Sequence, residues 1–309
     1  MVGQRGVKSC FFLTSLFSFI AHMFDSEFLT KLEYLSMVSR RAFQRQLLTP
    51  QRKKRLDHGV EFADHREYVP GDDLRLLDWN INARFGQLMI KRFVEEEDLH
   101  VYFFLDCSKS MKFGNPNKFD YAREVTAALA YIVLADWGRV STVTFAEGIL
   151  DVYPLTRGKQ HIIGLMRFLE RADTIGTATN LARTAREFSN GKFRPGLAVL
   201  VSDFFEVDGF RKGMDLLRFQ QYEPCVIQVH DQSEANPPLR GDFQLIDMET
   251  GVVNETTISE SMLRRYKTKF DAFLDSIKNY CLANNFGCTI TQTRVPFDQL
   301  IMQMMKTTS

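Results

Sequence analysis

The sequence predicts an α/β protein: a doubly wound, mostly parallel sheet, preceded by a small N-terminal β-containing module and followed by a C-terminal hairpin-helix extension. Three observations lead to this prediction. Residues 100–105 and 197–202 are continuous apolar runs of strand length, as strands buried on both faces require. Segments with apolar residues at helical spacing lie between such runs. Strands that alternate with helices of this length are typical of a parallel sheet.

The first 25 residues form an apolar N-terminal extension. Arg5 and Lys8 precede an apolar run from Cys10 to Phe24, a layout similar to a signal peptide, but no small-x-small cleavage site follows it. The run has roughly 15 residues, whereas a membrane-spanning helix needs about 20. We favour a translation start at Met23 or a loosely ordered extension. Export or membrane association is the alternative.

Residues 26–57 are predicted to form a helix followed by a basic connector. Apolar residues recur at helical spacing from Ser26 to Phe43, and Ser26 offers an N-cap. The basic residues of the connector are Arg40, Arg41, Arg45, Arg52, Lys53, Lys54 and Arg55. We favour a solvated segment; the alternative hypothesis is a contact with nucleic acid, an anionic surface or an acidic partner.

Residues 58–98 are predicted to be a small module built around a turn at residues 68–73, with extended stretches at 59–62 and 88–93. Because it is too small for a core of its own, we expect it to pack on the domain that follows. Its charged residues are Arg66, Asp72, Asp73, Arg75, Asp78 and Arg84. These residues could contact a partner, or they could bind one another within the protein. We favour contacts within the protein, because aspartates in turns commonly accept hydrogen bonds from backbone N–H groups and from neighbouring arginines.

Residues 99–235 are predicted to form the sheet domain. Strands are expected at residues 100–105, 139–145, 197–202 and 225–230. Helices are expected at residues 118–136, 159–171, 180–189 and 210–220. This alternation is what predicts the parallel sheet.

Residues 236–309 depart from that alternation and are expected to complete the domain. A β-hairpin is predicted from residues 242–247 and 252–257, joined through a Glu-Thr-Gly turn. A long helix is predicted over residues 259–284, with Ser259 as its N-cap. A last strand at residues 288–291 and a methionine-rich helix at 297–306 end the chain.

The composition describes an ordinary globular protein and limits its partners. With 39 basic and 38 acidic residues, the net charge of +1 gives no global reason to expect nucleic acid. The five cysteines have neither zinc-type nor CxxC spacing, so we expect reduced thiols. With no further hydrophobic span after residue 24, we expect a cytoplasmic protein without a transmembrane segment.

Oxygen-bearing side chains follow two of the predicted strands. The strand at 100–105 leads into Asp106, Ser108 and Ser110, and the strand at 197–202 leads into Asp203. A loop between them supplies Thr177 and Thr179. In doubly wound sheets, ligands bind beyond the carboxyl ends of the strands near the switch in strand order. Two carboxylates and several hydroxyls suit a hard cation, and we expect Mg²⁺, with Mn²⁺ or Ca²⁺ as alternatives.

This pattern of Asp-x-Ser-x-Ser after a buried strand, then Thr, then Asp after another strand, resembles the metal-ion-dependent adhesion site of von Willebrand factor A domains. The resemblance implies that Asp106, Ser108 and Ser110 coordinate the metal, that a threonine joins them, and that Asp203 lies close by. Thr179 is preferred because the sequence after it matches these domains, and Thr177 remains the alternative. The middle loop reads Gly-Thr-Ala-Thr and departs from the commoner Gly-Gly-Thr.

A narrower resemblance covers most of the chain. The stretch from Gly59 to Arg75, the pair Asp78-Trp79, the pair Ala83-Arg84 and residues 93–97 before the metal motif resemble the bacterial family called domain of unknown function 58. Members of this family often occur beside MoxR-type AAA+ ATPases. The resemblance therefore implies an ATPase partner and a chaperone-like or metal-insertion role, in protein assembly, maturation or stress response.

These features favour a metal-dependent protein-binding module over an enzyme. The sequence has no GxxxxGK[ST] loop, no GxSxG elbow, and Ser108 where a DxDxT phosphatase needs a second acid. Only Asp106 and Asp203 are evident, whereas two-metal hydrolases need several carboxylates. We expect the metal to bind an acidic side chain of a partner or client protein. Metal-dependent hydrolysis and binding of nucleic acid through residues 40–55 are the alternative hypotheses.

Overall fold

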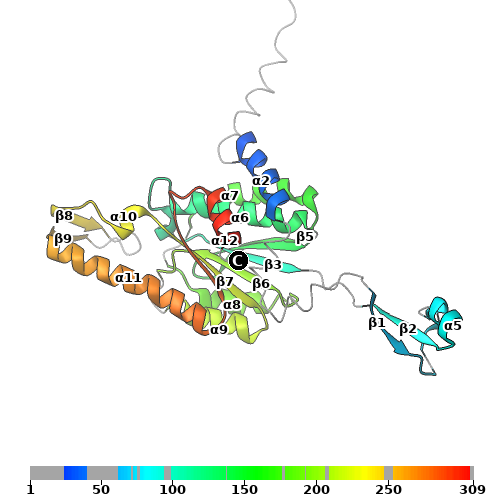
Figure 1. Ribbon diagram of the computed structural model, residues 1–309. Helices are drawn as coiled ribbons and strands as arrows, with labels where there is room; N and C mark the ends of the chain where they lie inside the picture. Colours follow the sequence, from blue (N-terminus) through cyan, green and yellow to red (C-terminus); the bar gives the residue numbers. More distant parts are fainter. Residues whose placement is uncertain are drawn as a thin grey trace, which may run out of the picture.

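A six-stranded sheet forms the centre of the protein in the computed structural model (Figure 1). The structure describes residues 24–39, 62–70, 72–74, 77–93, 99–136, 138–175, 178–191, 193–205, 209–246 and 253–306. The strands of the sheet are β3 (His100–Asp106), β4 (Arg139–Phe145), β5 (Ile149–Arg157), β6 (Leu197–Ser202), β7 (Glu223–His230) and β10 (Gly287–Gln292). Their order is β10-β7-β6-β3-β4-β5, and all pairs are parallel except β4 with β5.

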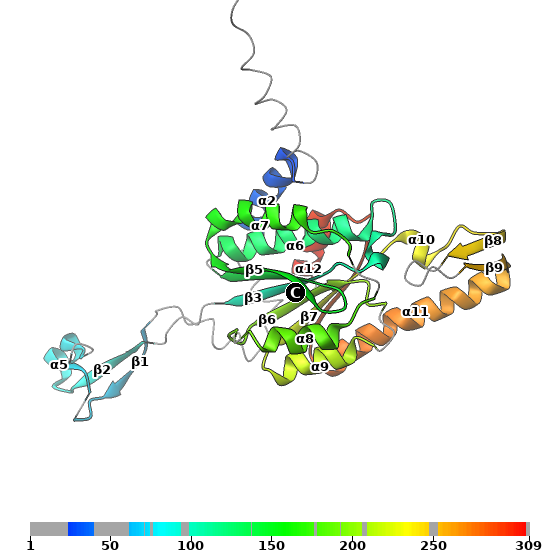
Figure 2. The ribbon, with the colours of Figure 1, turned by 180° about the vertical axis from the view of Figure 1, so that it is seen from behind.

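Helices cover both faces of this sheet, as Figure 2 shows from behind. One face carries α2 (Ser26–Ser39), α6 (Lys118–Ala135), α7 (Ile162–Arg171) and α12 (Phe297–Lys306). The other carries α8 (Leu181–Ser189), α9 (Arg211–Phe219) and α11 (Glu260–Ala283). The side chains of β3 alternate between two hydrophobic clusters, with Phe103 and Leu105 in one and Tyr102 and Phe104 in the other. This burial on both faces explains the continuous apolar run, and it confirms the predicted doubly wound sheet.

The helices and strands predicted for the sheet domain and the C-terminal extension are found within one or two residues of the predicted bounds, with four differences. Two short helical segments, Lys109–Lys112 and Gln232–Ala235, were not predicted. Residues 159–161 form a separate 3-10 turn, η3 (Lys159–His161), ahead of α7. The strand β5 was not predicted. It lies at the edge of the sheet with most of its side chains partly exposed, so it lacks the apolar run that marked its neighbours.

The upstream module consists of β1 (Phe62–Glu67), β2 (Met89–Phe93) and α5 (Trp79–Phe85). The predicted strand near residue 90 is confirmed. The one expected at 59–62 is wrong in its bounds, because the strand covers Phe62–Glu67 and pairs antiparallel with β2; residues 59–61 lie outside the described part. Both views draw this module away from the six-stranded sheet (Figures 1 and 2), so the expected packing on the following domain is not seen.

A C-terminal arm is formed by α10 (Gln232–Ala235), β8 (Gly241–Ile246), β9 (Val253–Ile258) and α11. The hairpin of β8 and β9 lies at its far end, and α11 runs back to the sheet (Figure 1). Ser259 caps α11 as predicted, accepting a hydrogen bond from the N–H of Met262 at 3.3 Å. The arm therefore starts at the carboxyl end of β7, and the end of α11 packs in the same helical layer as α8 and α9.

Two further expectations concern thiols and membranes. Cys107, Cys225, Cys281 and Cys288 are free thiols, while Cys10 lies outside the described residues. Within the described ranges, no helix combines the length and the apolarity that crossing a bilayer requires. The apolar run at residues 10–24 and the basic segment at 40–55 fall, apart from Phe24, outside those ranges.

Replacing Glu124 of α6 with Gln is expected to stabilise the protein at high pH. Burial, and then the nearby carboxylate of Asp120, raise the pKa of Glu124 to about 7. Because the folded state holds this proton more tightly than the unfolded chain, the stability it contributes is present at low pH and is lost as pH rises through about 7. The Gln variant should gain about 1 kcal/mol at pH 8, after allowance for solvent screening, and little near pH 4.5. Urea unfolding at both values measures this; an equal effect at both would contradict it.

Candidate metal centre

The carboxyl ends of β3 and β6 bring the candidate metal ligands together. These two strands are neighbours in the sheet, and the chain turns from β3 towards β4 on one side and later returns to β6 on the other. The site thus lies at the switch in strand order, where ligands of doubly wound sheets bind. The loop after β3 is fixed to the next strand, because the N–H of Cys107 donates to the carbonyl of Phe145 at 2.7 Å.

Asp106 is the fully buried carboxylate at the centre of this site. Its Oδ2 accepts a hydrogen bond from Ser202 Oγ at 2.5 Å, and its Oδ1 accepts one from the N–H of Ser108 at 2.9 Å. Thr179 Oγ1 lies 3.3 Å from Oδ2 and 3.5 Å from Oδ1. Burial, and then the charge of Asp203, raise the pKa of Asp106 to about 6. A carboxylate that is desolvated in this way gains most from a bound cation.

The serine hydroxyls complete a compact group of oxygens. Ser108 Oγ and Ser110 Oγ are 3.0 Å apart, and Ser108 is fully buried. Adjacent ligands of an octahedral Mg²⁺ ion with bonds of 2.0–2.1 Å are about 2.8–3.0 Å apart. The separations of 3.0 Å between the serines and of 3.3 Å between Thr179 and Asp106 are close to that spacing. The donor set therefore fits a divalent cation with water in the remaining positions.

Thr179 is positioned through the residue that follows it, Asn180. The N–H of the next residue, Asn180, donates to the carbonyl of Ala146 at 2.8 Å, beyond the end of β4. The side chain of Asn180 caps α8 by accepting from the N–H of Arg183 at 2.8 Å. Thr177, the alternative candidate, lies outside the described residues.

Asp203 lies at the same edge but is bound to a lysine. Lys118, at the start of α6, is fully buried, and its Nζ donates to Asp203 Oδ2 at 2.7 Å and to Glu234 Oε1 at 2.5 Å. Burial lowers the pKa of Lys118, but the two carboxylates outweigh it and raise the pKa overall. One buried lysine thus pairs with two carboxylates, Asp203 and Glu234, and the sequence pattern did not predict this ion-pair network.

The backbone directly after Asp203 is in an unusual conformation. Phe204 has a φ of 60°, in the left-handed region that residues other than glycine rarely adopt. Its N–H donates to Ser202 Oγ at 2.8 Å, and its buried ring packs edge-on against Phe210 with centroids 5.6 Å apart. These contacts hold the loop that carries Asp203.

The upstream charged residues are placed away from this edge and serve the module itself. Arg66 forms an ion pair with Asp72 at 2.5 Å, and Asp72 also accepts from the N–H of Val69 at 2.9 Å. Asp78 caps α5 and bonds to His65 Nε2 at 3.0 Å. The other three candidates are Asp73 and Arg84, which are exposed, and Arg75, which lies outside the described residues. Asp72 and Asp78 thus satisfy backbone donors, as the structural interpretation predicts.

Comparison with known proteins places the chain in a family. A family model described as "Protein of unknown function DUF58" matches residues 64–272. The chain belongs to this family. Most of the upstream module, the strands β3 to β7 and about the first half of α11 lie within the matched DUF58 region, so the candidate site is part of it, whereas β10 lies beyond it.

Curated relatives of this DUF58 chain are uncharacterised proteins. The protein Rv1480 of Mycobacterium tuberculosis (strain H37Rv) is 26% identical over 208 residues, which cover 66% of this chain and 65% of that protein. YeaD of Bacillus subtilis (strain 168) is 28% identical over 130 residues, 42% of this chain and 31% of that protein. The match thus spans slightly less than two thirds of the first relative.

Solved structures show weaker similarity to the DUF58 chain. BatB from Bacteroides thetaiotaomicron has a TM-score of 0.45 at 17% identity and covers 68% of this chain and 98% of that one. A mussel byssus protein, proximal thread matrix protein 1 with a zinc-occupied MIDAS motif, has a TM-score of 0.39 at 14% identity, covering 68% and 45%. The fold is therefore assigned from the strand order of the sheet and not from these structures.

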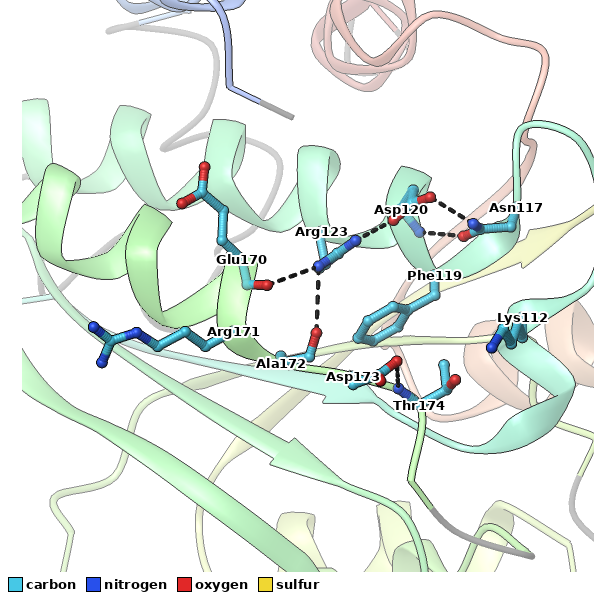
Figure 3. A pocket seen from close by; sticks show the side chains of 10 residues that line it. All are labelled: Lys112, Asn117, Phe119, Asp120, Arg123, Glu170, Arg171, Ala172, Asp173 and Thr174. Atoms are coloured by element: carbon cyan, nitrogen blue, oxygen red, sulfur yellow. Dashed lines mark hydrogen bonds and ion pairs between the residues drawn. The ribbon is translucent and has the colours of Figure 1, made fainter. Parts of the chain in front are cut away.

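A pocket of about 290 Å³ adjoins the loop that follows β3 in the DUF58 chain (Figure 3). Its wall includes Thr174, and the N–H of the next residue, Ile175, donates to the carbonyl of Cys107 at 2.9 Å. Arg123 lies over the Phe119 ring and donates to three carbonyls at the end of α7, so its role there is structural. The pocket has three basic and three acidic side chains and hence no net charge to select an ion.

Sequence reasoning missed three residues of this site. Ser202, at the end of β6, donates to Asp106 and was treated only as the last strand residue. Because Ser202 directly precedes Asp203 at the end of a predicted strand, its position could have identified it as part of the site. The contact of Lys118 with Asp203 spans 85 positions and that with Glu234 spans 116, and no motif connects them.

Proposed function

We propose that this protein is a non-enzymatic, metal-dependent protein-binding module of the von Willebrand factor A type, in which Mg²⁺ bridges Asp106, Ser108, Ser110 and Thr179 to an acidic side chain of a partner. The observation that carries the proposal is a buried carboxylate, Asp106, with the hydroxyl of Thr179 3.3 Å away and a pair of serine hydroxyls 3.0 Å apart in the same loop, at the switch in strand order. Mn²⁺ and Ca²⁺ are the alternative ions.

The charge balance supports an incoming carboxylate. Asp106 is the one acidic ligand that lacks an ammonium partner among the described residues at this edge, since Asp203 is bound to Lys118. A divalent ion held by one carboxylate and neutral hydroxyls keeps a net positive charge. Such an ion favours a further anionic oxygen in its open position.

The same donor set differs from that of a two-metal hydrolase. Within the described residues, no group of three or more His, Cys, Asp or Glu side chains is placed to hold a metal. Two-metal hydrolysis relies on such clusters of carboxylates. The groups around Asp106 are hydroxyls and a backbone N–H, which bind and orient an ion.

The partner we propose is a MoxR-type AAA+ ATPase, together with an acidic client protein, acting in the cytoplasm in protein assembly, maturation or stress response. This part follows from the resemblance to the DUF58 family. The geometry of the metal site does not identify this partner. The curated relatives are themselves uncharacterised and add no information about it.

Capture of a MoxR-type ATPase tests the proposal. The purified chain, immobilised, should retain the ATPase in Mg²⁺ and release it in EDTA, and Asp106→Ala should retain about as little in Mg²⁺ as the wild type does in EDTA. Thr30→Ala, at an exposed hydroxyl on α2, is the control and should bind normally. Capture that is indifferent to both EDTA and Asp106→Ala would refute the bridging mechanism. ATPase-independent turnover that EDTA abolishes would favour a hydrolase instead.

A further inference from the structure

Two thiols meet where α11 leads into the edge strand β10. Cys281 lies in the last turn of α11, and Cys288 is the second residue of β10. The Cys281 thiol donates a hydrogen bond to the sulfur of Cys288. The reversal between them is tight, because the N–H of Phe286 donates to the carbonyl of Cys281 at 2.8 Å and Asn285 has a φ of 57°. The fold therefore holds the two sulfurs together across residues 282–287.

The two thiols differ in accessibility and in charge. Cys281 is fully buried, whereas Cys288 is partly exposed at the edge of the sheet. The hydrogen bond from Cys281, and then the charge of Lys278 one turn earlier on α11, hold the pKa of Cys288 below its usual range. The same hydrogen bond, and then burial, raise the pKa of Cys281. Because the thiolate is the nucleophilic form of cysteine, Cys288 is the thiol that reacts first.

The other described thiols lack this combination. Burial raises the pKa of Cys225 to about 12, and burial also raises the pKa of Cys107. Cys225 is the nearest competitor, because a side chain on Gly287 would come within 2.8 Å of its Sγ. It packs, however, in the hydrophobic cluster on the opposite face of the sheet, whereas Cys288 packs against the cluster that contains Cys281. Cys281 is therefore the thiol that Cys288 faces.

The thiol pair is separate from the candidate metal centre. Cys288 pairs with Val226 in the amino-terminal half of β7, whereas the metal ligands follow the carboxyl ends of β3 and β6. An inference about these thiols is thus independent of the proposed function.

We propose that Cys288 and Cys281 form a reversible, peroxide-driven disulfide that fastens the end of α11 to the edge of the sheet. The Cys288 thiolate attacks one oxygen of hydrogen peroxide, the O–O bond breaks, and the other oxygen leaves as hydroxide, which yields a sulfenic acid. Cys281 then attacks that sulfur. The S–S bond forms, the S–O bond breaks, and the sulfenic hydroxyl leaves as water with the proton of Cys281. Peroxide takes up the two electrons that the thiols lose, and a dithiol returns them by exchange.

The test treats the purified, reduced full chain with a small molar excess of hydrogen peroxide. The protein is then unfolded in N-ethylmaleimide and digested with trypsin, which places both cysteines in one peptide, residues 279–294. In mass spectrometry this peptide should lack two hydrogens and carry no label, and dithiothreitol added before the maleimide should restore both labels. The oxidised protein should also unfold at a higher urea concentration than the reduced protein, because a cross-link restricts the unfolded chain.

Single variants separate the two steps. Cys281→Ser should stop at the sulfenic acid of Cys288, which dimedone traps. Cys288→Ser should leave Cys281 open to the maleimide after the same treatment, and peroxide should not change its urea midpoint. Cys225→Ala removes the neighbouring thiol and is the matched control, so it should form the disulfide as the wild type does.

Three results would overturn the inference. Peptide 279–294 would keep both labels at a peroxide dose that oxidises free cysteine in the same buffer. A disulfide that joins residues 279–294 to residues 219–240 would make Cys225 the partner in place of Cys281. A complete disulfide without a change in the urea midpoint would show that the bond does not fasten α11.

Discussion

Replacing Asp106 with Asn is expected to abolish metal binding and, in the same protein, to raise the stability of the metal-free fold. The carboxylate is fully buried and faces the charge of Asp203, which together raise its pKa to about 6. Above that pH the folded protein carries a charge that burial disfavours, so neutralising it should add about 1–3 kcal/mol to the free energy of unfolding at pH 8 without metal. An amide can still accept from Ser202 or from the N–H of Ser108.

Calorimetry and urea unfolding of the same samples check both effects. Mg²⁺ affinity should fall at least about a hundredfold, because the one charged ligand is lost. Added Mg²⁺ should stabilise the wild type and leave the variant unchanged, as linkage of binding to folding requires. Ser189→Ala, whose hydroxyl bonds within α8, is a control outside the site. Unchanged Mg²⁺ affinity in the Asn variant would remove Asp106 from the ligand set.

Replacing Lys118 with Met is expected to be the most destabilising change at the site. It leaves Asp203, with 1% of its side chain exposed, and Glu234, with 12%, as buried carboxylates without a cation. Removing one partner of a buried ion pair typically costs about 3–5 kcal/mol. Urea unfolding at pH 7 measures the loss.

Two comparisons decide whether the loss comes from the unpaired charges. The triple variant Lys118→Met, Asp203→Asn, Glu234→Gln removes all three charges and should recover most of the lost stability. Lys212→Met, at an exposed lysine of α9, should change stability by less than about 0.5 kcal/mol. If the triple variant is no more stable than Lys118→Met, lost packing rather than charge explains the effect.

The sheet was predictable because its central strands are buried on both faces. The bounds of β3 and β6 follow closely from their apolar runs. Edge strand β5 has no such run and escaped prediction, and so did α5, a seven-residue helix whose Trp79 is exposed. A strand or helix that is not buried on a face carries no periodic signal.

The candidate site was predictable to the extent that it depends on strand ends. Asp106, Ser108 and Ser110 follow one strand directly, so their closeness requires only that the strand be identified. The ion pair of Asp203 with Lys118 depends on how α6 packs across the sheet. Such contacts are set by tertiary packing, and a single sequence does not encode them in any local pattern.

The left-handed backbone of Phe204 makes the site dependent on the helical layer of α8, α9 and α11. A residue with a side chain held at this φ costs on the order of 1 kcal/mol or more. Burial of its ring against Phe210, next to α9, offsets that cost only while the helix is docked. We therefore expect local opening of α9 to release the loop that carries Asp203 before the sheet itself unfolds.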